Sequence, residues 1–158
     1  MTAKIKTNVT RILTSSKLEF DIITYESKDG KIDGISVADK IGKSSLEVFK
    51  TLVARTCDKE IVVFVIPAAN EINLKKAAKE IGVKKIDLIA VKELLTLTGY
   101  IRGGCSPIGM KKKYRTFFDN SVENLDKIIL SAGKIGIQVE ISPIDLIDLL
   151  DAKKIELE

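Results

Sequence analysis

The sequence predicts one mixed-sheet α/β domain that spans residues 1–158. Strand-like and helix-like segments are interspersed without a regular βαβ alternation, which argues against a doubly wound parallel sheet. The run EIVVFVIP at 60–67 is almost continuously apolar, as is typical of a central strand that is covered on both faces. A length of 158 residues suits a single domain with its own core, and no linker, repeat or low-complexity tract divides it.

The chain begins with a predicted helix over 7–18, where apolar residues recur at helical spacing behind a Thr7 or Asn8 cap. FDIITYES at 20–27 is rich in β-branched and aromatic residues and predicts a strand. A polar loop that contains glycines follows at 27–34.

The next segment, SVADKIG, predicts a short helix over 36–42 that runs from a Ser36 cap to a Gly42 stop. VFKTLVART at 48–56 alternates apolar residues with polar or small ones and predicts a strand. This strand leads into the apolar run at 60–67.

In the second half, helices are predicted at 73–82 and 90–99, and each ends at a glycine. Beyond a glycine-rich loop, three strands are predicted, at 114–119, 126–133 and 136–142. The last helix, 142–152, has Pro143 in its first turn, and the tail KKIELE after it is expected to fray.

The composition excludes several kinds of chemistry. The chain has no histidine, so it holds no Ser-His-Asp triad, no Cys-His dyad and no histidine-ligated metal. Two cysteines are too few for a disulfide framework or a four-thiolate zinc site, and no metal or other cofactor is expected. No apolar run approaches the roughly 20 residues that span a bilayer, and the N-terminus lacks the apolar stretch of a signal peptide. We therefore expect a cytoplasmic protein without membrane contact, either a monomer or a weak oligomer.

The net charge is only +4, but the lysines are grouped at 75–76, 84–85 and 111–113, and Arg115 follows the last group. Such groups suit an anionic partner such as RNA or a phosphate-bearing ligand. A solvated lysine face would give the same pattern, so the charge alone leaves both interpretations open.

Two features could carry chemistry. Lys50 lies on an otherwise apolar predicted strand, where it either points to water at a sheet edge or places a cation in a cleft. The loop GGCSPIG at 103–109 is either a rigid turn or a cradle of exposed backbone amides that binds an oxyanion or a carboxylate. Cys105 lacks a histidine to activate it and reads as a small loop filler more readily than as a nucleophile. Ser131, in a second glycine turn, offers a hydroxyl contact.

Taken together, several segments resemble the YbaK-type proteins, free-standing relatives of the editing domain of bacterial prolyl-tRNA synthetase. The resemblance covers nearly the whole chain, and its most specific elements are K-T-L and G-G-x-S-P-x-G in this order. The segments that carry it are TY at 24–25, VFKTL at 48–52, NLKKAAKEIGVKKI at 73–86, TGYIRGGCSPIGMKKK at 98–113 and SAGKIGIQVEISPIDL at 131–146.

The resemblance implies a compact α/β fold with a curved, partly barrel-like mixed sheet and surrounding helices. It also implies a catalytic role for Lys50 and a substrate-binding role for nine further residues. These are Tyr25, Thr51, Gly103, Gly104, Cys105, Ser106, Pro107, Ser131 and Gln138. Gln138 falls where some members carry an acidic residue, and a neutral amide cannot act as a base.

The implied activity is trans-editing, the hydrolysis of the ester of a mischarged tRNA, with Cys-tRNA(Pro) as the expected substrate. The reaction would be of the lyase type if the substrate's own thiol cyclised. Alternatives are a deacylase for alanyl- or seryl-tRNA, and a non-catalytic module that binds tRNA or a synthetase. The expected partners are mischarged tRNA and prolyl-tRNA synthetase.

Overall fold

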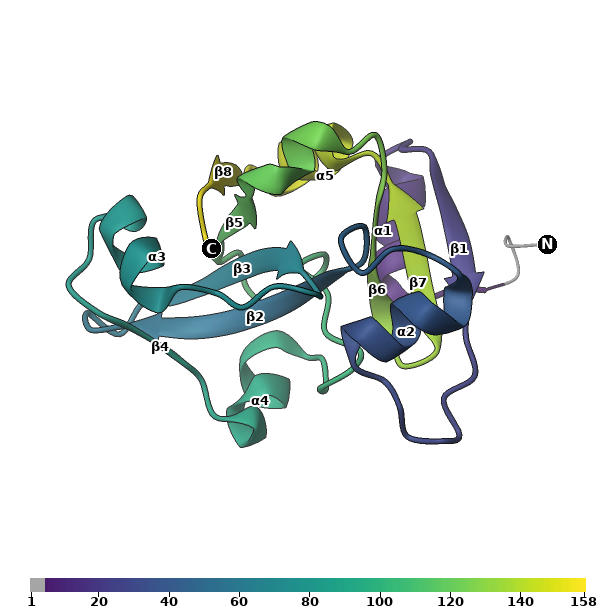
Figure 1. Cartoon of the computed structure of the whole chain (residues 1–158), viewed down its shortest axis with the longest axis horizontal. Helices are drawn as coiled ribbons and strands as arrows, with labels where there is room; N and C mark the ends of the chain where they lie inside the picture. Colours follow the sequence, from purple (N-terminus) through teal and green to yellow (C-terminus); the bar gives the residue numbers. More distant parts are fainter. Residues whose placement is uncertain (1–4) are drawn as a thin grey trace.

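The computed structural model describes residues 5–158, and within them the chain folds into α-helices, short 3₁₀ helices and two β-sheets (Figure 1). The helices are α1 (Asn8–Ser15), α2 (Gly34–Ile41), α3 (Leu74–Ile81), η2 (Val91–Glu93), α4 (Leu94–Thr98), η3 (Asn120–Asn124) and α5 (Pro143–Leu150). The strands are β1 (Phe20–Thr24), β2 (Phe49–Thr56), β3 (Ile61–Pro67), β4 (Ile86–Leu88), β5 (Arg115–Asp119), β6 (Ile128–Lys134), β7 (Ile137–Ile141) and β8 (Lys153–Ile155).

The strands are divided between two sheets, where the sequence predicted one. Three antiparallel strands form the sheet β1-β7-β6, and five strands form the mixed sheet β4-β2-β3-β5-β8, in which β3, β5 and β8 run parallel. A single bridge between Val48 and Ile129 joins the two sheets. Across the described residues neither sheet closes on itself, so the expected barrel-like curvature is not confirmed, whereas the compact mixed α/β class is.

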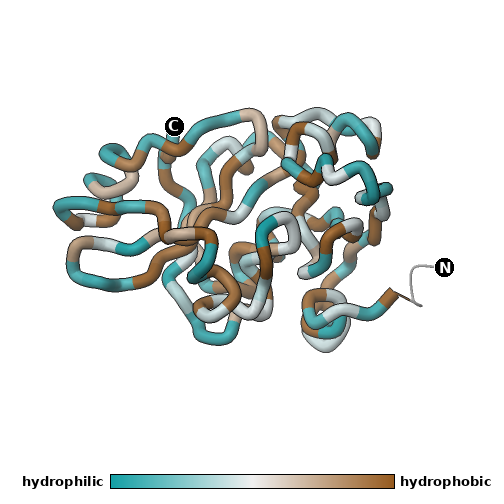
Figure 2. Tube along the Cα trace, turned by 90° about the horizontal axis from the view of Figure 1, so that it is seen from below, coloured by the Kyte–Doolittle hydropathy of each residue, from teal (hydrophilic) through white to brown (hydrophobic). Residues whose placement is uncertain are grey.

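The main core lies between the two sheets and is completed by α1 and α5. Val63 and Val65 of β3 face this core, while Val62, Phe64 and Ile66 on the other face of the same strand pack under α3. All five side chains are fully buried, so the prediction of a central strand covered on both faces is confirmed. Figure 2 shows hydrophobic stretches gathered toward the middle of the trace and hydrophilic ones along the outer loops.

Local signals set most helix ends as expected. Thr7 caps α1, Asn73 caps α3, and Ser142 caps α5. The predicted cap of α2 is wrong: the carboxylate of Asp33 accepts from the backbone N–H and the hydroxyl of Ser36, which places Ser36 inside the first turn. No helix of the described chain is long and apolar enough to cross a membrane.

The C-terminal tail was predicted to fray, and this is wrong. Residues 153–155 form β8, which pairs with β5 in parallel. The Leu157 side chain is fully buried against α3, and its backbone N–H donates to Asp119 Oδ1 at 3.2 Å. The short strand β4 was not predicted at all.

Candidate functional site

A cleft of about 750 Å³ opens beside the junction of the two sheets. Its walls come from the loop that leads into α2, the first half of β2, the loop before β5, and the paired strands β6 and β7. Six residues predicted from the sequence line it: Lys50, Thr51, Gly103, Cys105, Ser131 and Gln138. The fold therefore brings together residues that lie up to 88 positions apart, the separation of Lys50 and Gln138 (138 − 50).

The start of β2 is exposed to this cleft because its outer edge is only partly paired. The bridge at Val48 holds one end to β6, and β4 pairs only with residues 54–56 at the other end. Lys50 and Thr51 lie in the open part between them. Lys50 has no carboxylate within ion-pair distance among the described residues, so its ammonium is available to a ligand.

Thr51 and Gln138 contribute polar groups that lack a protein partner. Thr51 Oγ1 is buried without any hydrogen bond. Gln138 is only 5% exposed, and its side-chain amide has no partner among the hydrogen bonds of residues 5–158. Since buried polar groups are almost always satisfied, the unpaired Thr51 hydroxyl indicates a place for a polar ligand or water, and Gln138 lines the same cleft. Ser131, opposite Gln138 in the β6–β7 ladder, instead has its hydroxyl engaged by the N–H of Gly133 at 3.1 Å.

The glycine loop supplies fewer free amides than predicted. The N–H of Gly104 donates to the Ile101 carbonyl at 3.0 Å, and Pro107 has no N–H to give. In the described part of the chain, no protein oxygen accepts from the N–H groups of Gly103 and Cys105, which both line the cleft. The cradle is thus reduced to two candidate donors, with Gly103 in a left-handed conformation at φ +87°.

Hydrogen bonds hold this loop in one shape. The Tyr100 hydroxyl donates to the Ile108 carbonyl at 2.5 Å, and Asn8 of α1 donates to the Gly109 carbonyl at 3.1 Å. Ser106 is fully buried and its hydroxyl accepts from the Ile108 N–H, so it shapes the loop and does not reach the cleft. Pro107 lines a separate cavity on the other side of the loop.

Cys105 does not have the properties of a nucleophile. Burial raises the pKa of the Cys105 thiol to about 12, despite an opposing hydrogen bond with Thr98. The thiol is therefore protonated at neutral pH, whereas attack requires the thiolate. This agrees with its interpretation as a loop filler.

Tyr25 does not line the cleft, although its hydroxyl is buried without a partner. The ammonium of Lys40 lies 5.7 Å from the centre of its ring. The same ammonium binds the Glu26 carbonyl, the Asp29 carboxylate and the Lys31 carbonyl at 2.6, 2.7 and 2.9 Å. Lys40 thereby holds the loop that carries Gly30 and Ile32 into the cleft wall.

Sequence reasoning missed a further group of lining residues, which belong to the loop before α2 and to the segments that follow β3 and α4. They include Ile32, Asp33, Glu71 and Arg102. Arg102 stands directly before the glycine loop, and this adjacency was the one available signal. The described residues contain no cluster of metal-binding side chains.

The predicted basic groups differ in their availability. Lys76 donates to Glu156 at 3.0 Å, and Arg115 forms two bonds with Glu60 at 2.7 and 2.8 Å. Lys111 and Lys112 are exposed and have no carboxylate partner within residues 5–158. Only part of the positive charge is therefore free for a phosphate.

Comparison with known proteins gives a consistent result. Residues 34–149 match the family described as the aminoacyl-tRNA editing domain. A protein of Enterococcus faecalis, provisionally named Cys-tRNA(Pro)/Cys-tRNA(Cys) deacylase EbsC, is 38% identical over 96% of this chain and 93% of its own length. The proline–tRNA ligase of Brachyspira hyodysenteriae is 34% identical over 58% of this chain, which corresponds to 16% of that enzyme.

A solved structure shares the fold. It is described as a trans-editing enzyme for prolyl-tRNA synthetase, a provisional assignment, and superposes with a TM-score of 0.81 over 98% of both chains at 18% identity.

Proposed function

Because the chain belongs to the aminoacyl-tRNA editing domain family, we propose that it is a trans-editing deacylase that hydrolyses the ester of a mischarged tRNA. The observation that carries the proposal is the cleft, which gathers an unpaired ammonium, an unpaired hydroxyl, an unpaired amide and free backbone N–H groups around one space. A hydrolase without histidine can lower the barrier by positioning the ester and stabilising charge on its oxygen.

The proposed substrate is Cys-tRNA(Pro), since the relative that matches almost the whole chain is named for cysteinyl-tRNA. Alanyl- and seryl-tRNA are the alternatives. The similarity to part of a proline–tRNA ligase supports prolyl-tRNA synthetase as a partner that supplies the charged tRNA. This activity belongs in the cytoplasm, where tRNA is charged.

Each group has a proposed role. The N–H groups of Gly103 and Cys105 bind the ester carbonyl and the negative charge that develops on it. The Lys50 ammonium binds the phosphate of the terminal adenosine and orients the ester. Thr51 and Gln138 bind the aminoacyl group or the ribose through their unpaired polar atoms.

Two routes of attack fit this arrangement. In the first, water adds to the carbonyl carbon, the ribose oxygen leaves with a proton, and free amino acid and tRNA result. In the second, the substrate thiol adds to its own carbonyl, gives its proton to the leaving ribose oxygen, and forms a thiolactone that water opens. Both routes place negative charge on the carbonyl oxygen and need no protein nucleophile.

The test is release of labelled cysteine from Cys-tRNA(Pro) by purified protein. Lys50→Ala is expected to abolish release with an unchanged thermal unfolding midpoint, and Cys105→Ser is expected to remain active. Near-normal turnover by Lys50→Ala would remove Lys50 from the mechanism, and an inactive Cys105→Ser would argue for a covalent thioester. Binding of tRNA without any release would identify a non-catalytic module.

A panel of cysteinyl-, alanyl- and seryl-tRNA separates the substrates and the routes. Alanine has no nucleophilic side chain, so the thiol route predicts that alanyl-tRNA is cleaved far more slowly than cysteinyl-tRNA. Equal rates for alanyl-tRNA and cysteinyl-tRNA would identify water as the nucleophile and would contradict the proposed preference for cysteine.

A further inference from the structure

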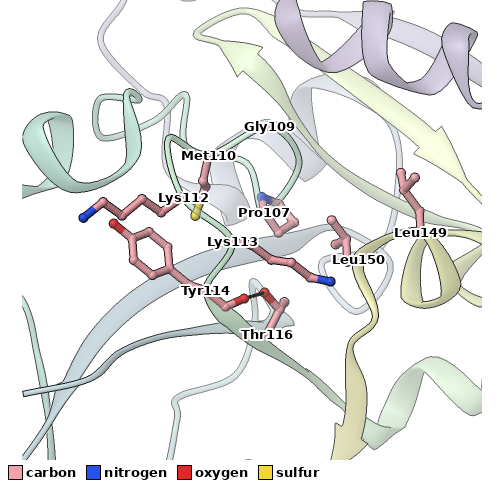
Figure 3. Close-up of a pocket in the computed structure, with 9 residues that line it drawn as sticks. All are labelled: Pro107, Gly109, Met110, Lys112, Lys113, Tyr114, Thr116, Leu149 and Leu150. Atoms are coloured by element: carbon pink, nitrogen blue, oxygen red, sulfur yellow. Dashed lines mark hydrogen bonds between the residues drawn. The ribbon is translucent and has the colours of Figure 1, made fainter. Parts of the chain in front are cut away.

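A second cavity, of about 260 Å³, lies on the side of the glycine loop away from the cleft lining. Figure 3 shows the end of the loop and the start of β5 on one side and the last turn of α5 on the other. Its lining combines two lysines with an apolar wall and one aromatic ring. The residues are Pro107, Gly109, Met110, Lys112, Lys113, Tyr114, Thr116, Leu149 and Leu150.

The charge in this cavity is available to a ligand. Within the described residues Lys112 has no carboxylate partner, and Lys113 has only Asp151, at 3.8 Å, with both side chains largely exposed. An exposed pair at this distance contributes little. By contrast, the neighbouring Arg115 is held by two bonds to Glu60 and does not line the cavity.

The cavity has a fixed shape. The Tyr114 hydroxyl donates to the Leu97 carbonyl at 2.7 Å, so the ring cannot swing away. The backbone N–H of Lys111 donates to the Thr98 carbonyl at 3.1 Å. This bond attaches the loop to the end of α4 just before Lys112 and Lys113. The side chains of Leu149 and Leu150 lie across the cavity from this ring, and Met110 lies on the same side as the ring (Figure 3).

The position of the cavity next to the cleft restricts the kind of ligand that the cavity could bind. Cys105 lines the cleft and Pro107 lines the cavity, and two residues of extended chain span at most about 7 Å. The cavity and the cleft therefore lie on either side of the same short stretch of loop, where the N–H of Cys105 is proposed to bind the ester carbonyl. A strand of RNA that places its last nucleotide in the cleft has its preceding nucleotides at this distance.

We propose that this cavity binds a nucleotide of the tRNA 3′ end, next to the terminal adenosine, with its base against the apolar wall and the phosphates on its two sides on Lys112 and Lys113, whose side chains extend in opposite directions (Figure 3). The inference rests on the proposed function. Single-stranded nucleic acid is commonly held by a cationic groove combined with an aromatic or apolar surface. One ring and one small cavity provide space for a single nucleotide and not for a platform that stacks several bases.

The first test compares the double variant Lys112→Ala/Lys113→Ala with the double variant Lys153→Ala/Lys154→Ala. The control also removes two adjacent exposed lysines, one of which has a carboxylate partner, Glu123, at 3.3 Å. Affinity for uncharged tRNA is measured between 50 and 200 mM salt. Two lost contacts to single-strand phosphates should lower the slope of log affinity against log salt by about 1.4. The affinity advantage of the wild type over the cavity variant should then shrink about sevenfold across this range, and the control should behave as wild type.

The second test asks whether a base is bound or only a charge. Cytidine monophosphate and inorganic phosphate are titrated separately while the methyl signals of Met110, Leu149 and Leu150 are followed by NMR. The proposal expects shifts of these methyl groups with the nucleotide and not with phosphate. Equal responses to both ligands, or none, would reduce the cavity to a surface charge and overturn the proposal. If an acidic phosphopeptide bound with the same affinity as cytidine monophosphate, the proposal would also be overturned.

Failure of this proposal can be told apart from failure of the proposed function. Binding of uncharged tRNA needs no hydrolysis, so Lys50→Ala should still show the salt dependence that the lysines of the cavity create. If amino acid release is absent but this dependence is present, the proposed reaction is wrong and the cavity stands. If Lys112→Ala/Lys113→Ala hydrolyses full-length substrate with an unchanged KM, the cavity is not a tRNA site.

Discussion

Gly103→Ala tests the central claim that the glycine loop presents its backbone to the substrate. Gly103 has φ +87°, and a Cβ at this position would lie 2.5 Å from Cδ1 of Ile32, which lines the same cleft. Gly82 offers a matched control because its φ is +81° and a Cβ there meets nothing within 4 Å. Both variants strain the backbone, but only Gly103→Ala adds a contact.

The expected magnitudes follow from this difference. An L-residue in the left-handed region costs ~1–2 kcal/mol, and this cost is common to both variants. Overpacking costs ~1–3 kcal/mol, and the lower end applies because the atom that must move is the tip of a half-buried side chain. Gly103→Ala should therefore lose ~1 kcal/mol more of the free energy of unfolding than Gly82→Ala.

Activity should separate the two variants more strongly. A shifted Gly103 amide no longer meets the developing oxyanion, and loss of one such donor costs at least ~2.7 kcal/mol, or about 100-fold in kcat. Gly82 lies at the end of α3, outside the cleft, and Gly82→Ala should retain the wild-type rate. The assays are urea denaturation and cysteine release from Cys-tRNA(Pro).

Ile32→Val completes the test because it removes the Cδ1 atom. In a double-mutant cycle with Gly103→Ala, the coupling in the free energy of unfolding should reach ~1 kcal/mol. Additivity within ~0.3–0.5 kcal/mol, together with wild-type activity of Gly103→Ala, would refute both the contact and the role of the amide.

Four further predictions follow from the burial or the contacts of single side chains. The Cys105 thiol, with a pKa of about 12, should resist iodoacetamide at pH 8 while the exposed Cys57 reacts; rapid labelling of both cysteines in the folded protein would contradict the burial. Between pH 9 and 12 the unfolded thiol ionises and the folded one does not, so stability should fall with rising pH by more than in Cys105→Ala. The hydrogen bond between Glu60 and Arg115 lowers the pKa of the Glu60 carboxyl from its ordinary value of 4.5. This pair therefore stabilises the fold above pH 4.5, and its contribution is lost as the pH falls through the lowered pKa. Since both side chains are partly exposed, Glu60→Gln should cost only ~0.2–1 kcal/mol at pH 7 in urea denaturation, and a loss above this range would show a larger structural role. Leu157→Ala should cost ~2–5 kcal/mol in the same assay, because the side chain is fully buried, and a loss below ~0.5 kcal/mol would support the frayed tail that the sequence predicted.

Short-range signals explain why much of the fold was predictable. Asn73 and Gly82 bracket α3, and Ser142 with Pro143 starts α5, because caps and stops act through hydrogen bonds within one turn. The cap of α2 was misplaced by three positions because Asp33 and Ser36 are both good capping residues. Sequence alone does not show which of two candidates three positions apart accepts the backbone N–H.

The tail after α5 shows where local reasoning ends. KKIELE has too few apolar residues to predict a strand by itself. In the structure, β8 pairs with β5, and the Leu157 side chain packs beneath α3. Both partners lie more than 30 positions away in the chain. The division of the strands into two sheets has the same origin, because pairing partners are chosen by the packing of the whole domain.

Composition and patterns along the chain were enough to predict the class of the domain, the central strand and the lack of histidine chemistry. The residues of the candidate site were predicted from the resemblance to a known family. The folded chain shows which of these residues lie at one place. It brought Lys50, Gly103 and Gln138 to one cleft, turned Ser106 and Pro107 away from it, and left Lys112 unpaired while Arg115 was bound to Glu60. The physical reason is that the availability of a charge or an amide depends on its neighbours in space, and long-range strand pairing selects those neighbours.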